Sequence, residues 1–207
     1  MSVVYNYDID SHSTGPCEIF LMVDKPGASA EVTIDYDSAT GRFAPSTASG
    51  ANANALHLGL IKDGVDITHK SSVKEFTAHQ LTGAYREKLT QEEAMIHAKG
   101  ALLPGGDYDL AAAILQGATL SNPTGKRKLD GGGSRNVTYI TVLAIWARLG
   151  DPTKYDYELL YRARNIGDYV LTLDNENESA IDVNFKGFPD VSRPPGKQIW
   201  QRVTSET

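Results

Sequence analysis

The chain has 207 residues, of which 41% are hydrophobic and 22% charged, and its 26 acidic and 20 basic side chains give a net charge of −6. A chain of this length can bury roughly 70% of its unfolded surface in one core, so we expect a single domain over residues 1–207. The acidic excess argues against a protein that coats nucleic acid by neutralising phosphates, because such binding needs clustered Lys and Arg.

The sequence also limits the compartment in which the chain is expected to fold. Cys17 is the only cysteine, so an intrachain disulfide is excluded. The sequence has no apolar run of about 18 residues that could cross a bilayer. The first residues lack the basic start and apolar core of a signal peptide, so we expect synthesis in a reducing cytoplasm.

The first quarter of the chain predicts an arm, a hairpin and a loop. Residues 1–15 are polar and predict a loosely held N-terminal arm. The apolar run Cys17–Val23 and the alternating segment Glu31–Asp37 predict two strands that pair as a hairpin. Ser38–Asn54 is rich in Ser, Ala, Gly and Asn, which predicts an exposed loop, with a linker between domains as the less favoured alternative.

The second quarter predicts a long hairpin. Strand patterns in Ala55–Ile61 and Val65–His79 flank the turn signal Lys62-Asp63-Gly64. Gln80–Thr90 has few core candidates, and Glu92–Leu103 alternates weakly after it. We therefore expect residues 80–90 to form the tip of a hairpin that projects from the body, since long loops in compact domains are usually functional or disordered.

One helix is expected, followed by an irregular segment. Tyr108–Gln116 has apolar residues on one side, with Asp107 as the N-cap and Gly117 just past the C-terminus. The helix is short and should close one end of a sandwich. Thr119–Asn136 carries basic and glycine runs and predicts a loop.

The segment Val137–Phe188 carries the strongest strand patterns. Four strands of an antiparallel meander are predicted at Val137–Trp146, Tyr155–Arg164, Tyr169–Leu173 and Ile181–Phe188. In the second of them every other residue is apolar, which predicts one buried face. That face holds Tyr155, Tyr157, Leu159, Tyr161 and Ala163. Residues 189–207 contain three prolines and predict an extended C-terminal arm. The fold class is therefore mainly β, a sandwich of antiparallel sheets with one short flanking helix.

Catalytic chemistry finds no support in the sequence. The five histidines are not spaced like zinc ligands, and Cys17 stands in a predicted strand without a neighbouring motif. The glycine run after Asp130 precedes a strand and lacks the pattern of a phosphate-binding loop. We predict no enzyme, no cofactor and no metal site.

The order of these features resembles the tail tube, or major tail, proteins of long-tailed bacteriophages. The family shows a succession of strand, stacking loop, strand, helix and final strand, which this chain resembles at Leu58–Lys70, Thr90–Leu103, Tyr108–Leu115 and Val183–Val203. The resemblance implies a β-sandwich that forms hexameric rings, which stack into a hollow tube that DNA crosses without specific binding. It also implies tape measure, tail terminator and tail-tip proteins as partners, and a place in the tail of a virion assembled in the host cytoplasm.

Intersubunit contacts are expected in Gln80–Thr90 and Pro189–Thr207, because both are long, lack core residues and would be costly to order alone. The candidate contact residues are Leu81, Tyr85, Arg86, Pro189, Arg193 and Trp200. The resemblance places the inner strands of a tube in the long hairpin, whose carboxylates would then face the lumen and repel DNA. The candidates are Asp66, Glu75, Glu92 and Glu93. Ordinary solvated surface is the alternative for these four.

Two other classes of protein stay open. A carbohydrate-binding or adhesion module would need an exposed aromatic platform, which the tyrosines of Tyr155–Tyr161 could supply only from the predicted core face. Another virion component, such as a tail-tip adaptor or a head decoration protein, would share the lack of catalytic groups.

Overall fold

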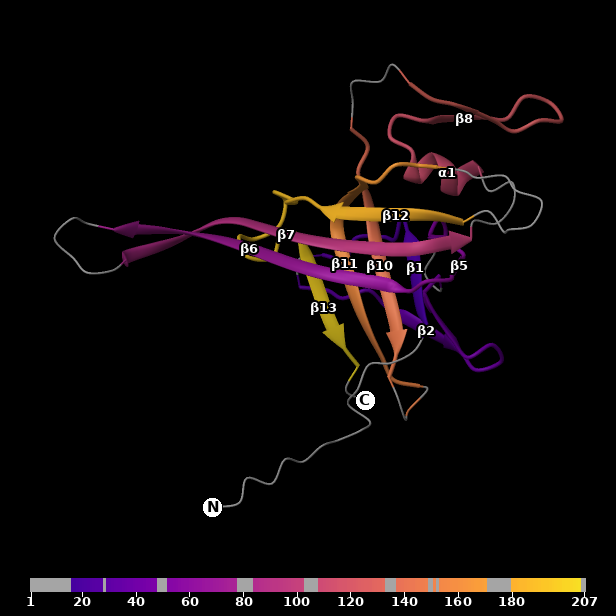
Figure 1. Ribbon diagram of the computed structural model, residues 1–207. Coiled ribbons are helices and arrows are strands. Elements are labelled where there is room, and N and C mark those ends of the chain that lie inside the picture. The colour runs from indigo at the N-terminus through magenta and orange to yellow at the C-terminus, as the bar shows by residue number, and fades with distance from the viewer. Residues whose placement is uncertain are drawn as a thin grey trace.

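The computed structural model describes residues 16–27, 29–47, 52–77, 84–102, 108–132, 137–148, 151, 153–170 and 180–205. Within these ranges the chain forms antiparallel sheets and a single helix (Figure 1). This confirms the predicted mainly β class with one short helix.

The largest sheet has nine strands. Its main path runs through β4 (Leu56–His57), β1 (Cys17–Leu21), β10 (Ile140–Ala147), β11 (Tyr155–Asn165), β12 (Ala180–Gly187), β7 (Ala84–Leu102) and β5 (Leu60–Ile61). Two further strands branch from this path, because β13 (Trp200–Thr204) pairs with β11 and β6 (Val65–Thr77) pairs with β7. β11 thus has β13 beside its first half and β12 beside its last residues.

Three of the four meander strands are where the sequence predicts them. β10, β11 and β12 match the predicted strands within three residues at each end. The fourth prediction, Tyr169–Leu173, is wrong at Tyr169 and Val170, which are not in a strand, and its remaining residues lie outside the described ranges. Branched and aromatic side chains dominate β10, and such residues pack well on a pleated surface, which explains why it forms a central strand.

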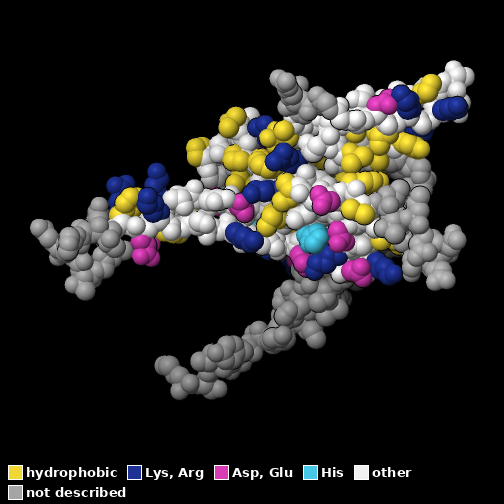
Figure 2. All heavy atoms as spheres, turned by 45° about the horizontal axis from the view of Figure 1, so that its top comes forward, with side chains coloured by type: hydrophobic (Ala, Val, Ile, Leu, Met, Phe, Trp, Pro, Cys, Tyr) yellow, Lys and Arg dark blue, Asp and Glu magenta, His cyan; other side chains and the backbone are white. Residues whose placement is uncertain are grey.

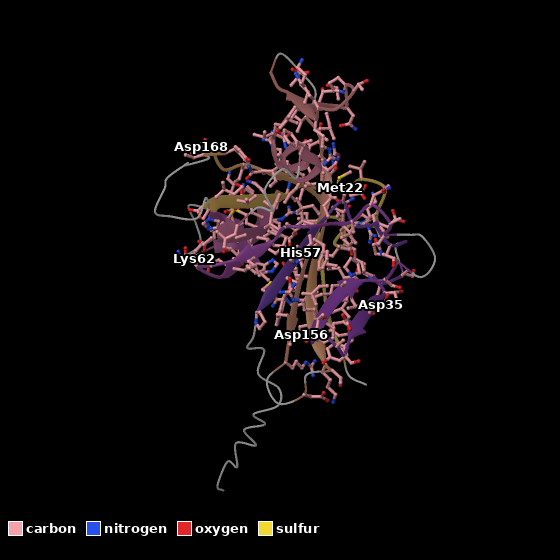
Figure 3. All side chains as sticks on the ribbon, turned by 90° about the vertical axis from the view of Figure 1, so that its right-hand side faces the viewer. Met22, Asp35, His57, Lys62, Asp156 and Asp168 are labelled. Carbon is pink, nitrogen blue, oxygen red and sulfur yellow. The ribbon has the colours of Figure 1, made fainter. Side chains whose placement is uncertain are left out.

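The nine-stranded sheet folds over itself, so that β7 and β12 run across β10 and β11 (Figure 1). From the side, the layer holding His57 and Asp156 lies between Lys62 and Asp168 on one side and Asp35 on the other (Figure 3). A first hydrophobic core fills the fold and includes Ile19, Val142, Leu160, Val183 and Phe185. Fully burying each such side chain stabilises the fold by about 1.5–3 kcal/mol.

A second hydrophobic core lies on the other face of β1, β10 and β11. It includes Phe20, Phe43, Leu143, Tyr157 and Leu159. The hairpin of β2 (Ile34–Asp37) and β3 (Arg42–Pro45) contributes to it. β11 is therefore buried on both faces, and the expectation of only one buried face is wrong.

The β2–β3 hairpin corrects two predictions. Cys17–Val23 does not pair with Glu31–Asp37, because β1 pairs with β10 and β4, whereas β2 pairs with β3. Ser38–Asn54 is not a uniform exposed loop, since Phe43 of β3 is only 4% exposed. The turn between the two strands is compact because Asp37 accepts hydrogen bonds from Ala39 and Thr40.

The helix α1 (Tyr108–Ile114) closes one end of the first core with its buried Leu110 and Ile114. It ends two residues before the predicted Gln116, and Gly117 follows with a φ of 72°, the left-handed conformation that commonly ends a helix. The predicted N-cap, Asp107, lies outside the described ranges. The predicted loop Thr119–Asn136 contains a small hairpin, β8 (Thr119–Ser121) with β9 (Lys128–Asp130).

Candidate assembly surface

The far part of the β6–β7 hairpin projects from the body as a two-stranded ribbon (Figure 1). We call residues 70–76 of β6 and 86–92 of β7 the arm. All its residues are exposed except Phe76, which is half-buried. The projecting part of the hairpin therefore begins at residue 70, well before the predicted tip at residues 80–90, and residues 84–90 of that predicted tip belong to the strand β7.

Strand alternation gives the arm two faces. One continues the side that packs into the first core at Ile67 and Ile96, and we call it the acidic face. Its cross-strand pairs are Ser71 with Glu92, Val73 with Leu89, and Glu75 with Glu87. The opposite side, which we call the basic face, pairs Ser72 with Gln91, Lys74 with Lys88, and Phe76 with Arg86.

Two further observations support this division. Lys74 Nζ lies 5.5 Å from the centre of the Phe76 ring, as expected for neighbours on one face. Lys and Arg side chains gather on one side of the arm and an acidic side chain lies on the other (Figure 2). Val73 and Leu89 are 54% and 52% exposed, so the acidic face also presents an apolar pair to solvent.

The base of the arm is anchored to the body by a buried carboxylate. Glu158 of β11 is fully buried, and Arg202 of β13 donates a 2.9 Å hydrogen bond to its Oε2 from Nε. His69 of β6 contacts the same carboxylate at 2.9 Å and packs on the Trp200 ring, with ring centres 4.3 Å apart. Three strands that are distant in sequence thus meet at one charge.

The C-terminal segment is not the extended arm that the sequence predicts for residues 189–207. It turns back at Asp190 and Arg193 and ends in β13, which pairs with β11. Arg193 is 5% exposed, and its guanidinium lies 3.4 Å from the centre of the Tyr161 ring. Arg193 is therefore buried within its own chain, and its role as an intersubunit contact stays a prediction.

A buried carboxylate holds the segment in place. Asp190 accepts hydrogen bonds from Lys25 and from Ser192. The hydrogen bond from Lys25 is the main reason why the pKa of Asp190 falls from 3.8 to about 2.

The remaining predicted contact residues are spread over the arm and the segment. Arg86 lies on the basic face, Pro189 is exposed and Trp200 is half-buried in β13. Leu81 and the side chain of Tyr85 lie outside the described part of the structure. An open groove of about 790 Å³ runs between the base of the arm and the C-terminal segment. Its lining includes Gln91, Glu92, Pro189, Trp200 and Arg202.

The four predicted lumen residues do not share one face of the hairpin. Glu75 and Glu92 lie on the acidic face, whereas Asp66 and Glu93 point to the opposite side. Asp66 pairs with Lys99 and Glu93 with Lys186, each at 2.5 Å, and these contacts lower the pKa of both carboxyls. A lumen wall formed by one face of the hairpin could therefore carry Glu75 and Glu92, or Asp66 and Glu93, but not all four carboxylates.

The cysteine, His57 and the core tyrosines lie in surroundings typical of residues that stabilise a fold. The thiol of Cys17 is buried enough to raise its pKa to about 12, far from that of a reactive thiolate. His57 contacts Glu18 on the neighbouring strand. Tyr157 and Tyr161 are 1% and 5% exposed, so they offer no platform for a sugar ring.

Sequence reasoning missed Lys74, Lys88 and Glu158. The two lysines carry a local signal, because Lys70 and Lys74 lie an even number of positions apart, as do Arg86 and Lys88. Glu158 carries none, since its partners are 89 and 44 residues away in sequence.

Comparisons with known proteins add no family. No protein-family model matches the chain, and a search of curated proteins found no significant similarity. Among the residues described, no three His, Cys, Asp or Glu side chains are grouped to hold a metal ion, and no helix has the length and apolarity to cross a membrane.

Proposed function

We propose that the protein is a structural subunit of a phage tail tube, which assembles as stacked hexameric rings and forms a conduit for DNA. The observation that carries the proposal is the arm, a long two-stranded ribbon outside the body of the fold. A lone two-stranded hairpin is marginally stable in water. The arm nevertheless exposes Val73 and Leu89 opposite each other, which favours a function in contact with another chain.

The resemblance in the order of elements supplies the kind of assembly. In the tail tube family the corresponding loop stacks one ring on the next. The acidic composition of this chain suits a conduit, because a wall lined with Lys and Arg would bind the phosphates of passing DNA.

The purified protein tests the proposal by sedimentation velocity and negative-stain electron microscopy over a range of concentrations. We expect rings and tubes. The double variant Val73→Thr/Leu89→Thr keeps strand-forming side chains but removes apolar surface, and should remain monomeric. Val170→Thr changes a valine outside the arm that is 63% exposed and is the matched control, which should assemble normally.

Other results would exclude the proposal. A protein that stays monomeric at all concentrations, or that forms single rings without ever stacking, is not a tube subunit. Single rings would favour a tail-tip adaptor, and a monomer that binds glycans would favour the adhesion module.

A further inference from the structure

The arm places like charges directly opposite each other. Lys74 faces Lys88 across the two strands, and the next position places Glu75 opposite Glu87. Directly opposed side chains on one sheet face have Cβ atoms about 4.5–5.5 Å apart, and like charges there are destabilising. Within the described part of the chain, none of the four makes an ion pair. The arm alone therefore carries two unfavourable pairs.

A bulge in β7 creates this arrangement. The register shifts by one residue between Ser72 and Val73, so that no residue of β6 is paired opposite Thr90, whose hydroxyl instead donates a 3.0 Å hydrogen bond to the Ser72 carbonyl. If the register on the body side of the bulge continued, Glu75 would stand opposite Lys88, an attractive pair. The bulge separates the two signs, and bulges commonly re-aim side chains in this way.

The result is a ribbon with complementary sides. The acidic face offers Glu75, Glu87 and the apolar pair Val73–Leu89, whereas the basic face offers Lys74 and Lys88, with Phe76 and Arg86 beside them. β-sheets stack face to face about 10 Å apart, close enough for side chains of opposite charge to meet. Each face fits the other face of an identical arm.

We infer that the acidic face of one copy's arm lies against the basic face of the arm of the next copy. The contact is heterologous, because two different surfaces meet, and heterologous contacts close into rings or continue as open stacks. A two-fold dimer that brought the same faces together would oppose like charges. The inference rests on the proposed function in taking a second copy as partner, but it can fail on its own.

A polyanion such as DNA is the competing partner for the basic face. It would neutralise Lys74 and Lys88 but would leave Glu75 and Glu87 opposed and without cations. A second copy accounts for both faces at once, which is why we favour it.

Charge reversal tests the inference in the full-length chain. The first variant is Lys74→Glu/Lys88→Glu, which makes both faces acidic, and the second is Glu75→Lys/Glu87→Lys, which makes both basic. The third combines all four substitutions and exchanges the faces. Every variant keeps like charges directly opposite each other at both positions, so the repulsion within each cross-strand pair is retained. Lys126→Glu/Lys128→Glu, on or beside the β9 strand, gives the same change in net charge as the first variant and is its control.

We expect either reversed variant alone to need at least about tenfold more protein to associate, because like charges then oppose each other at the contact. An equimolar mixture of the two should associate in a 1:1 ratio, since every contact again joins opposite charges. The four-fold exchange and the control should associate within about threefold of the wild type. Sedimentation velocity measures the association, and tags of different mass measure the ratio.

The inference is overturned if the reversed variants associate like the wild type, or if the exchanged variant and the mixture both fail to recover. Tubes formed by the reversed variants would leave the proposed function intact while excluding stacking by charge. Charge-dependent association of the wild type without tubes would support stacking by charge and exclude the proposed function. Loss of DNA binding in the first variant with normal association would assign the basic face to DNA.

Discussion

Replacing Arg202 should lower the free energy of unfolding more than neutralising Glu158, the buried carboxylate that Arg202 contacts. Glu158 is fully buried, whereas the Arg202 side chain is 46% exposed. Substituting Arg202 by Met removes the main hydrogen-bond donor and leaves a buried charge with only His69. The His69 contact is the weaker one, since its hydrogen bond to Oε2 is 3.2 Å long and Oε1 accepts no well-aligned bond from any described residue.

The loss of unfolding free energy in each variant depends on which charged group remains without its partner. Removing one partner of a buried ion pair costs about 3–5 kcal/mol when the remaining charge stays buried. Because His69 remains, we expect about 2–4 kcal/mol for Arg202→Met. Glu158→Gln instead leaves Arg202 and His69, which reach water and hydrate, and its amide oxygen still accepts a hydrogen bond. We expect about 0–2 kcal/mol for that change.

Urea unfolding at neutral pH, at concentrations too low for association, measures both free energies of unfolding. The double variant completes a thermodynamic cycle, in which Arg202→Met should cost at least about 1 kcal/mol less when residue 158 is Gln. If Glu158→Gln costs more than Arg202→Met, or if the two effects simply add, Arg202 does not act by compensating the buried charge.

Two further predictions concern packing and pH. Gly187→Ala should lower the free energy of unfolding by about 1–3 kcal/mol, because the new Cβ would lie 2.9 Å from Ile199 Cγ2 and the core would be overpacked. The control Gly131→Ala, whose Cβ would have nothing within 4 Å, should change this free energy little. Equal melting temperatures for the two variants would contradict this reasoning. The depressed pKa of Asp190 means that its ionised form stabilises the fold fully above about pH 4 and loses this contribution as the pH falls toward 2. Asp190→Asn should therefore flatten the dependence of melting temperature on pH between 4 and 2, and an unchanged slope would count against the Lys25 contact.

Local patterns predicted the elements well. The alternation in Tyr155–Asn165 and the capped apolar stripe of Tyr108–Ile114 depend on neighbours in sequence, and both elements form close to their predicted bounds. The sequence also predicts the projecting hairpin, although residues 84–90 of the predicted tip belong to the strand β7.

Pairing and burial could not be predicted in the same way. Cys17 of β1 lies opposite Trp146, and no local pattern connects residues so far apart. Leu160 and Glu158 belong to the predicted solvent face of β11, yet both are fully buried because the sheet folds over that face. The sequence predicts a loop at Phe43 because the segment around it is rich in small and polar residues, and only the pairing of β2 with β3 brings Phe43 into the second core.

The assembly surface depends both on local sequence patterns and on strand pairing. The acidic and basic residues of the arm are evident in the sequence. Their separation onto opposite faces depends on the bulge at Thr90, which no sequence pattern predicts. The sequence predicts Arg193 at a subunit contact because Pro189–Thr207 is long and lacks core residues, but contacts with Tyr161 and Asp190 bury its side chain within the chain.

The branching of the sheet at β11 has a consequence for biosynthesis. The side of β11 from Asp156 to Leu160 is completed by β13, whose residues follow all other strands of the sheet. At about 5–20 residues per second, a ribosome needs several seconds to travel from one strand to the other. During that time the nascent chain presents an open strand edge, which neighbouring chains on the same messenger could pair with before Trp200 arrives.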